Sequence, residues 1–336
     1  MPQPVLRDEY DLGLPHLGPF ALGESPTLKH FGHLRWLSFE QAAGVPTARV
    51  QDSKGRRLYA TFYYIDIAFP LSAPANAFRE NDRIVVLGDL SAYGRNILDG
   101  HFAIYRAGDA RAESMGVPEP ATQQQFLEAG IPFIRLSNIF IQQEQGPDRL
   151  RIGQPANADF SKIHAIREAP EGHERNREAK DQGYFWDAPS GSTRKFEITH
   201  EHPVDPDRDV NAAGLVYFAN FPAFFDVGER RVMSSLPGGG VPRQFQDKRG
   251  TLRRRIGFFG NARKEDAIRM TVQCALDPAP VLAESPGVPY GRLWFTSRLE
   301  RASDGGILAV TTCERLSRLA DDAEVEQWIQ YARSIA

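Results

Sequence analysis

The pattern that most constrains this chain is an apolar helix followed by several strand-like segments. An apolar face with helical spacing runs through the second half at positions i, i+3, i+4, i+7 and i+11. Its residues are Phe221, Phe224, Phe225, Gly228 and Val232. This spacing predicts a helix over 221–236, with Asn220 as its N-cap. Such a helix must bury its apolar face, and a sheet with one apolar face would cover it.

The same order of elements occurs in both halves of the chain. A first helix is predicted over 28–43, before Gly44. Segments rich in β-branched and aromatic residues predict strands in the first half at 57–69, 83–90, 97–105, 133–143 and 150–152. The last two would form a hairpin through Gly146 and Pro147. In the second half the predicted strands are 196–204, 251–259, 267–275, 290–300 and 307–316.

This repetition predicts an α+β fold of two helix-wrapped antiparallel sheets that form a pseudo-dimer within one chain. We expect the first half to span 1–158, with 1–26 as an extended arm, and the second to span 193–336. Between them, 159–192 is charged and short of aliphatic residues, which predicts a linker or surface excursion.

Bulk composition narrows the classes of function. The formal net charge is -3, so no global field favours nucleic acid or an anionic membrane. The two cysteines, Cys274 and Cys313, give no metal-ligand spacing and fit a reducing compartment. No signal peptide or membrane-length apolar run is visible. We therefore expect a cytoplasmic protein that needs no metal or other cofactor.

A recognisable segment leads into the second predicted helix. Residues 209–220 read DVNAAGLVYFAN, and this segment resembles the start of the central helix in hotdog-fold acyl-CoA thioesterases. Gly214, Val216 and Asn220 match the pattern of that family, and Asp226 and Glu229 supply acidic helix positions. The resemblance implies a double hotdog. The position of the catalytic aspartate of those thioesterases is Asn211 here, and an amide cannot act as a general base.

A closer resemblance is to the bifunctional acyltransferase/decarboxylases of polyketide biosynthesis, typified by the leinamycin-pathway enzyme. Three segments carry it, namely 61–65 (TFYYI), 208–219 (RDVNAAGLVYFA) and 257–262 (GFFGNA). The resemblance implies removal of CO2 from a (methyl)malonyl-CoA and transfer of the acyl group to an acyl carrier protein. It also implies dependence on a strand tyrosine, for which Tyr63 and Tyr64 are the candidates.

Physical chemistry adds roles for the residues around this segment. Backbone N–H groups at a helix start, including that of Phe218, can hold a developing oxyanion. We expect Asn211 to donate a hydrogen bond there, and Gly214 to take part in oxyanion or substrate binding with Phe218. Because adjacent strand residues point to opposite faces, one of Tyr63 and Tyr64 should face the cleft, and Tyr64 is our first choice.

Several further residues are candidates for binding. Ser137 and Asn138 interrupt an apolar strand and could line the cleft or mark a strand end. Arg253 and Arg255 share one face of a strand and could contact CoA phosphates or a carrier protein, although a solvated basic face is the alternative. His33 keeps a dehydratase function open.

The sequence thus predicts an acyltransferase/decarboxylase whose partners are acyl-CoA and an acyl carrier protein. A hotdog thioesterase or dehydratase is one alternative, and a non-catalytic carrier-docking protein is another. A homodimer is compatible with the sequence. The acyl group and the pathway stay open.

Overall fold

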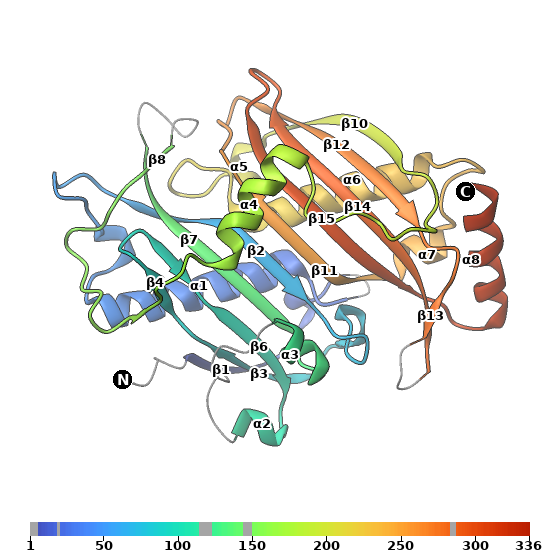
Figure 1. Ribbon diagram of the computed structural model, residues 1–336, viewed down its shortest axis with the longest axis horizontal. Coiled ribbons are helices and arrows are strands. Elements are labelled where there is room, and N and C mark those ends of the chain that lie inside the picture. The colour runs from blue at the N-terminus through green and yellow to red at the C-terminus, as the bar shows by residue number, and fades with distance from the viewer. Residues whose placement is uncertain (1–5, 19–20, 114–122, 144–149, 283–286) are drawn as a thin grey trace.

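A path of ten antiparallel strands runs through the whole molecule, in the order β1-β3-β6-β7-β2-β11-β15-β14-β12-β10 (Figure 1). This computed structural model describes residues 6–18, 21–113, 123–143, 150–282 and 287–336. The first five strands of the path belong to the first half of the chain and the last five to the second half. The pairing of β2 with β11, which we call the seam, joins the two halves into one sheet.

The strands have the following bounds. Those of the path in the first half are β1 (Leu6–Asp11), β2 (Tyr59–Ala68), β3 (Arg83–Gly88), β6 (His101–Arg106) and β7 (Phe133–Gln143). Those in the second half are β10 (Phe196–Pro203), β11 (Arg249–Phe258), β12 (Ala267–Leu276), β14 (Pro289–Arg301) and β15 (Ile307–Arg318). Short strands flank the path as β4 (Ser91–Tyr93), β5 (Ile97–Asp99), β8 (Leu150–Ile152), β9 (His164–Ala165) and β13 (Val281–Leu282).

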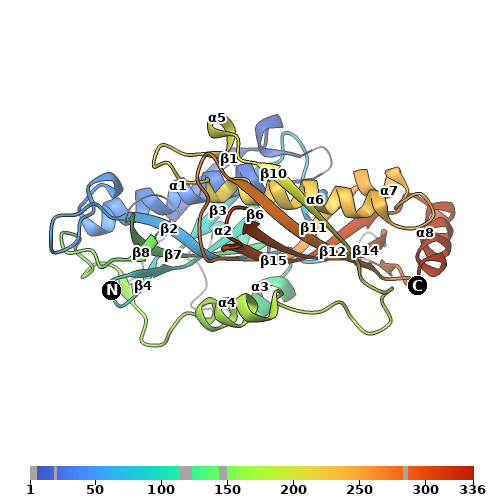
Figure 2. The same ribbon diagram turned by 90° about the horizontal axis from the view of Figure 1, so that it is seen from above.

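Helices cover both faces of this sheet. The α-helices are α1 (Glu24–Ala43), α2 (Ala110–Glu113), α3 (Gln123–Glu128), α4 (Glu171–Gln182), α5 (Pro206–Asp209), α6 (Phe221–Ser235), α7 (Arg243–Asp247) and α8 (Asp322–Ser334). Single 3-10 turns are η1 (Leu14–His16), η2 (Thr47–Arg49), η3 (Ala75–Ala77) and η4 (Phe218–Asn220). Helices α1 and α6 lie on one face of the sheet, the inner face, and α3 and α4 lie on the other, the outer face (Figure 2). None of the described helices is long and apolar enough to cross a membrane.

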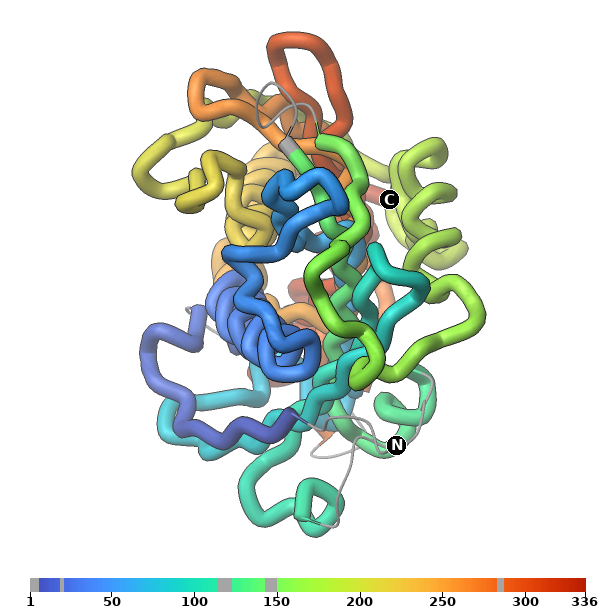
Figure 3. The backbone as a smooth tube through the Cα atoms, turned by 90° about the vertical axis from the view of Figure 1, so that its left-hand side faces the viewer, coloured from blue at the N-terminus to red at the C-terminus, as the bar shows by residue number. Residues whose placement is uncertain are grey.

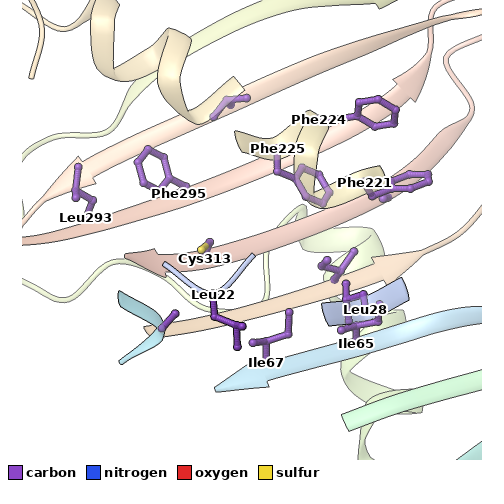
Figure 4. Packing of buried hydrophobic residues seen from close by; sticks show 14 of the residues in the cluster. Leu22, Leu28, Ile65, Ile67, Phe221, Phe224, Phe225, Leu293, Phe295 and Cys313 are labelled. Carbon is purple, nitrogen blue, oxygen red and sulfur yellow. The ribbon is translucent and has the colours of Figure 1, made fainter. Parts of the chain in front are cut away.

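The main hydrophobic core lies between the sheet and the two long helices. It contains residues of both halves, such as Leu28 of α1 and Phe225 of α6, and it is continuous across the seam (Figure 4). The predicted apolar face of α6 is confirmed, because all five of its residues are buried. A Cβ at Gly228 would lie 2.6 Å from the sulfur of Met270 and 2.7 Å from a methyl of Val272, so this glycine lets α6 approach β12 closely.

Asn220 occupies the predicted N-cap position, but the capping role predicted for its side chain was wrong. Its carboxamide makes no capping bond to the helix. It donates instead to the backbone carbonyl of Arg208 at 3.0 Å and to that of Asp209 at 3.4 Å. The side chain therefore ties the helix start to the preceding segment. The predicted hairpin of β7 and β8 is confirmed by their antiparallel pairing, and its turn at Gly146 and Pro147 lies outside the described residues.

Strand β2 contains a bulge that overturns one prediction. Its register with β7 shifts between Phe62 and Tyr64, so Tyr63 is an extra residue. Tyr63 and Tyr64 therefore do not point to opposite faces. The ring of Tyr63 meets His173 of α4, and that of Tyr64 meets Phe185, both on the outer face.

The stretch predicted as a linker contains a helix. Helix α4 lies over the outer face, across the sheet from α1 (Figure 3), and it contacts both β2 and β11. A Cβ on Gly172 would overlap the ring of Tyr64, and one on Gly257 would overlap the carboxamide of Asn176. Asn176 also donates to the carbonyl of Tyr63 at 2.8 Å. The divisions at 158 and 193 stay a prediction, and the arm predicted over 1–26 contains β1 and the first turn of α1.

We predict that Gly257→Ala displaces α4 from the seam. The added methyl has to push Asn176 aside, so the free energy of unfolding should fall by about 1–3 kcal/mol. Urea unfolding measures it. In an Asn176→Ala background, Gly257→Ala should lower the free energy of unfolding clearly less, because the carboxamide that the methyl would overlap is gone. An equal cost in both backgrounds would contradict this account of the contact.

Candidate functional site

A cavity of about 450 Å³ opens where the seam ends. Strands β2 and β11 pair only from Tyr64 with Gly257 to Ala68 with Arg253. Beyond that point the two strands separate, and the segment 211–218 together with the start of α6 fills the other side. The cavity therefore lies between the two halves of the chain and is walled by both.

All three segments that carry the sequence resemblance meet at this cavity. The first segment contributes Thr61, Phe62 and Tyr63 of β2. The second contributes six residues, namely Asn211, Ala213, Leu215, Val216, Tyr217 and Phe218. The third contributes 258–261, at the end of β11 and just after it. The three stretches are far apart in sequence, and nothing in the spacing of residues required them to meet. Their convergence makes this cavity the candidate site.

Asn211 lines the cavity and shapes the turn beside it. Its side-chain oxygen accepts from the backbone N–H groups of Ala213 at 2.9 Å and Leu215 at 3.2 Å. Its Nδ2 group has no acceptor among the described residues. Gly214 supplies the turn with a φ of 73°, where other residues are strained, but it does not line the cavity. Asn211 is thus oriented by its oxygen, and its amide N–H groups are left for a ligand.

Asn261 fixes the same segment from the opposite side, and sequence reasoning missed this role. Its Oδ1 accepts from the N–H of Val216 at 2.8 Å and from that of Ala262 at 2.9 Å. Its Nδ2 donates to the Val216 carbonyl at 3.2 Å. One carboxamide therefore satisfies both backbone groups of Val216 and sets the distance between the turn and the end of β11.

Phe218 opens the helical stretch of η4 and α6 at the cavity wall. The N–H groups at a helix start have no acceptor within the helix, so they present partial positive charge. The ring of Phe218 lies 3.9 Å, centroid to centroid, from that of Phe62. These two rings, one from each half of the chain, therefore contact each other across the cavity.

The two tyrosines are placed differently from our first choice. Tyr63 lines the cavity, whereas Tyr64 does not and its hydroxyl donates to Asp66 at 3.2 Å. The Tyr63 hydroxyl is buried and makes no hydrogen bond among the described residues, although Ser137 lies beside it. Burial raises the pKa of Tyr63, and the charge of Asp99 raises it further. The Tyr63 phenol is therefore neutral and protonated near pH 7.

Ser137 and Asn138 are both buried and neither lines the cavity. Ser137 donates to Asp99, and Arg135 donates to the same carboxylate at 2.7 Å. Asn138 donates to the carbonyl of Thr61 at 3.5 Å. These polar residues on β7 are held by the sheet and its buried carboxylate and do not line this cavity, so their role in substrate binding stays a prediction.

The acidic helix positions belong to a buried ion-pair network away from the cavity. Glu229 is fully buried and lies 2.7 Å from Arg254 and 2.9 Å from Arg315. Asp226 pairs with Arg315, and Glu24 of α1 lies 2.8 Å from Arg254. The network ties both long helices to β11 and β15. These carboxylates are engaged by arginines and do not face the cavity.

Arg253 and Arg255 share a face, as predicted, because both guanidinium groups lie over the ring of Trp186. Arg255 is buried and pairs with Asp66 at 2.7 Å. Arg253 is half-buried and donates to Gln123 at 3.0 Å. Neither lines the cavity, so their contact with CoA or a carrier protein stays a prediction.

The chemistry of the lining is distinctive. Its described residues include tyrosines, threonines and two asparagines, but no carboxylate, histidine, serine or cysteine. Arg57, which stacks on Tyr59 with the guanidinium carbon 4.5 Å from the ring centroid, is the one cation among them. His33 is exposed on α1 and does not line the cavity. No described cluster of His, Cys, Asp or Glu could hold a metal ion. The site thus offers hydrogen-bond donors rather than a general base.

Two solved structures resemble this chain over nearly its whole length, whereas no family model and no curated protein matches it. One is a protein from Lactobacillus plantarum, provisionally assigned as an oleoyl thioesterase, with 10% identity and a TM-score of 0.59 over 95% of this chain and 98% of that one. The other is an acyl-ACP thioesterase from Bacteroides thetaiotaomicron, with 8% identity and a TM-score of 0.52 over 93% and 97%. At these identities the likeness establishes the fold, and the predicted double hotdog is confirmed.

We predict that Asn261→Ala loosens the cavity wall. The change removes the three hydrogen bonds to Val216 and Ala262 and leaves buried backbone groups unpaired, so the free energy of unfolding should fall by about 1–3 kcal/mol in urea titrations. Asn157→Ala is the control. Its side chain makes two hydrogen bonds to exposed backbone, with Gln51 and Arg49, which water can replace, so its loss should be smaller. If Asn261→Ala had the same free energy of unfolding as the wild type, Asn261 would not hold the cavity wall.

Proposed function

We propose that this chain is an acyl-thioester enzyme that decarboxylates a malonyl-type CoA thioester and passes the acyl group to an acyl carrier protein. The observation that carries the proposal is the lining of the cavity, which offers donors for an oxyanion and no general base among its described residues. Hydrolysis by an activated water, and dehydration by a histidine with a carboxylate, both need a base there. Decarboxylation does not, because the substrate supplies the charge.

The chemical step is the heterolysis of one carbon–carbon bond. The bond to the carboxylate breaks, CO2 leaves, and the electron pair passes to the thioester as an enolate. The negative charge develops on the thioester oxygen, and the Nδ2 group of Asn211 and the N–H of Phe218 are proposed to donate hydrogen bonds to it. A proton then adds to the α-carbon, the carrier thiol attacks the thioester carbon, and CoA leaves as its thiol.

An amide at position 211 suits a substrate that carries a carboxylate. Two carboxylates about 4 Å apart would repel by roughly 4 kcal/mol at an effective dielectric constant of 20. An aspartate at this position would therefore oppose binding of a malonyl group, whereas Asn211 carries no charge. Arg57, which is exposed just before β2, is the one cation among the described lining residues and could attract the anionic substrate.

Tyr63 is proposed as the proton donor to the enolate. Its raised pKa keeps the phenol protonated, so it can donate a proton although it is a weaker acid, and a phenolate nucleophile is disfavoured. Of the two tyrosines it is the one that lines the cavity, and its hydroxyl lies beside Ser137. The near neighbours in structure are named as thioesterases, which supports acyl thioesters as the substrate class.

The direct test is mass spectrometry of the products from a panel of acyl-CoA and malonyl-type CoA substrates, each with and without a phosphopantetheinylated carrier protein. The proposal expects CO2 loss and acyl-carrier product from a malonyl-type substrate only. Free acid formed from simple acyl-CoA would instead assign the chain as a hydrolase. Carrier binding without any turnover would assign it as a docking protein. The predicted carrier contact at Arg253 and Arg255 would show in the same assay as a salt-dependent effect of their substitution.

Substitution of Asn211 is predicted to separate the two chemistries. Asn211→Ala removes one oxyanion donor, so turnover should fall by about 10²–10³-fold. Asn211→Asp should lose malonyl-type activity through repulsion and gain slow hydrolysis of neutral acyl-CoA. Steady-state assays with both substrates measure these changes. Full activity of Asn211→Ala on a confirmed substrate would place the site elsewhere.

The two tyrosines are predicted to differ in what their loss affects. Tyr63→Phe should lower turnover by about 10²-fold, because a general acid is removed. Tyr64→Phe should leave turnover near the wild-type value and lower thermal stability, because it loses the bond to Asp66. Comparing kcat and Tm for the pair checks the assignment, and a reversed pattern would make Tyr64 the working residue.

A further inference from the structure

The two halves are related by a pseudo-two-fold axis through the seam. Asp66 faces Arg255 at the middle of the five pairs that join β2 to β11. The bulged residue of β2 is Tyr63, and that of β11 is Leu252, where the register with β15 shifts. Each lies three positions before its central residue, since 66 − 63 and 255 − 252 are both 3. The bulges of β2 and β11 therefore lie at equivalent positions about the axis.

A second cavity, of about 620 Å³, lies at the position that the first cavity would take after rotation about this axis. The first cavity is bounded by the start of α6, by α1 and by the bulged end of β2. The second is bounded by the start of α1, at Gly23 and Glu24, by α6 from Val227 to Ser235, and by the start of β11 at Arg249. Nothing so far assigns a ligand to this second position, and its lining is charged where that of the first is aromatic.

The carboxylates that line the second cavity are already engaged. Glu24 and Asp226 pair with Arg315, and Asp247 pairs with Arg230 at 2.8 Å. Buried charges in proteins are normally neutralised by such partners. Glu24 and Asp226 also share Arg254 and Arg315 with the buried Glu229, so these three carboxylates contact two arginines and the third positive charge near them is that of Arg249.

Arg249 balances the charge of this cluster without contacting any of its three carboxylates. It donates to the backbone carbonyl of Gln246 at 2.7 Å, but no described carboxylate lies within 4.0 Å of it. Its Nε is buried and has no acceptor. Burial lowers the pKa of Arg249 and the charge of Arg315 lowers it further, whereas the charges of Glu229 and Asp226 raise it.

We propose that this second cavity binds a small oxyanion, a carboxylate or a phosphate, through Arg249. A guanidinium group with a free Nε edge matches the two oxygens of such a group. Arg231, which also lines the cavity and has no described carboxylate partner, adds donors from α6, whereas the hydroxyls of Ser234 and Ser235 already donate to Gln246 and to the Val232 carbonyl. The site is independent of the decarboxylation proposed above, and it holds whether or not the first cavity is catalytic.

Thermal unfolding of the full chain tests the site. Sodium phosphate and sodium malonate, each against sodium chloride at equal ionic strength, should raise the Tm of the wild-type protein by a few degrees in a saturable way. The more effective of the two identifies the oxyanion class. A Tm that phosphate and malonate raise no more than chloride does would overturn the proposal.

Substitution of Arg249 shows whether the effect belongs to this cavity. Arg249→Met keeps an apolar stem and removes the guanidinium group with its unpaired Nε, so the oxyanion-dependent rise should disappear whatever the Tm of the variant without oxyanion. Arg249→Gln serves if the methionine variant does not fold. Arg269→Met, on the exposed part of β12, is the matched control and should keep the full rise. A rise retained in the Arg249 variants would refute the site, and the malonyl-CoA assay is unaffected by that outcome.

Discussion

The backbone pairing of β2 with β11 is the interaction on which the rest of the structure depends. It makes one sheet from two halves, so the apolar faces of α1 and α6 are buried in one continuous core. The pairing is short, and where it stops at Tyr64 and Gly257 the strands separate and the cavity forms. The seam therefore holds the halves together and also determines where a ligand can enter between them.

The fold could be predicted from the sequence because its signals are local. The helical spacing of Phe221, Phe225 and Val232 predicts α6, and runs of β-branched and aromatic residues predict the strands. Helix α4 was missed because its sequence is charged and has no apolar stripe. It is held by tertiary approach at Gly172 and Gly257, and such contacts leave no periodic signal.

The candidate site could be predicted only in part. The segment around Asn211 was found because its motif is contiguous, and the resemblance to known enzymes linked it to 61–65 and 257–262. The orientation of Tyr63 and Tyr64 could not be predicted, because one extra residue in β2 reverses the alternation and no residue type marks the bulge. The ion pairs of Glu229 with Arg254 and of Arg255 with Asp66 could not be predicted either, because they depend on which elements become neighbours in the fold.

The ion pair between Asp66 and Arg255 shows why the two halves belong in one chain. These residues occupy equivalent positions on either side of the pseudo-two-fold axis. In an assembly of two identical subunits, each would face its own copy, and two like charges about 4 Å apart would repel by roughly 4 kcal/mol at an effective dielectric constant of 20. Covalent fusion lets the sequence differ on the two sides of the axis. The charge at the centre thus favours heterotypic pairing of the halves and disfavours self-association of either half alone.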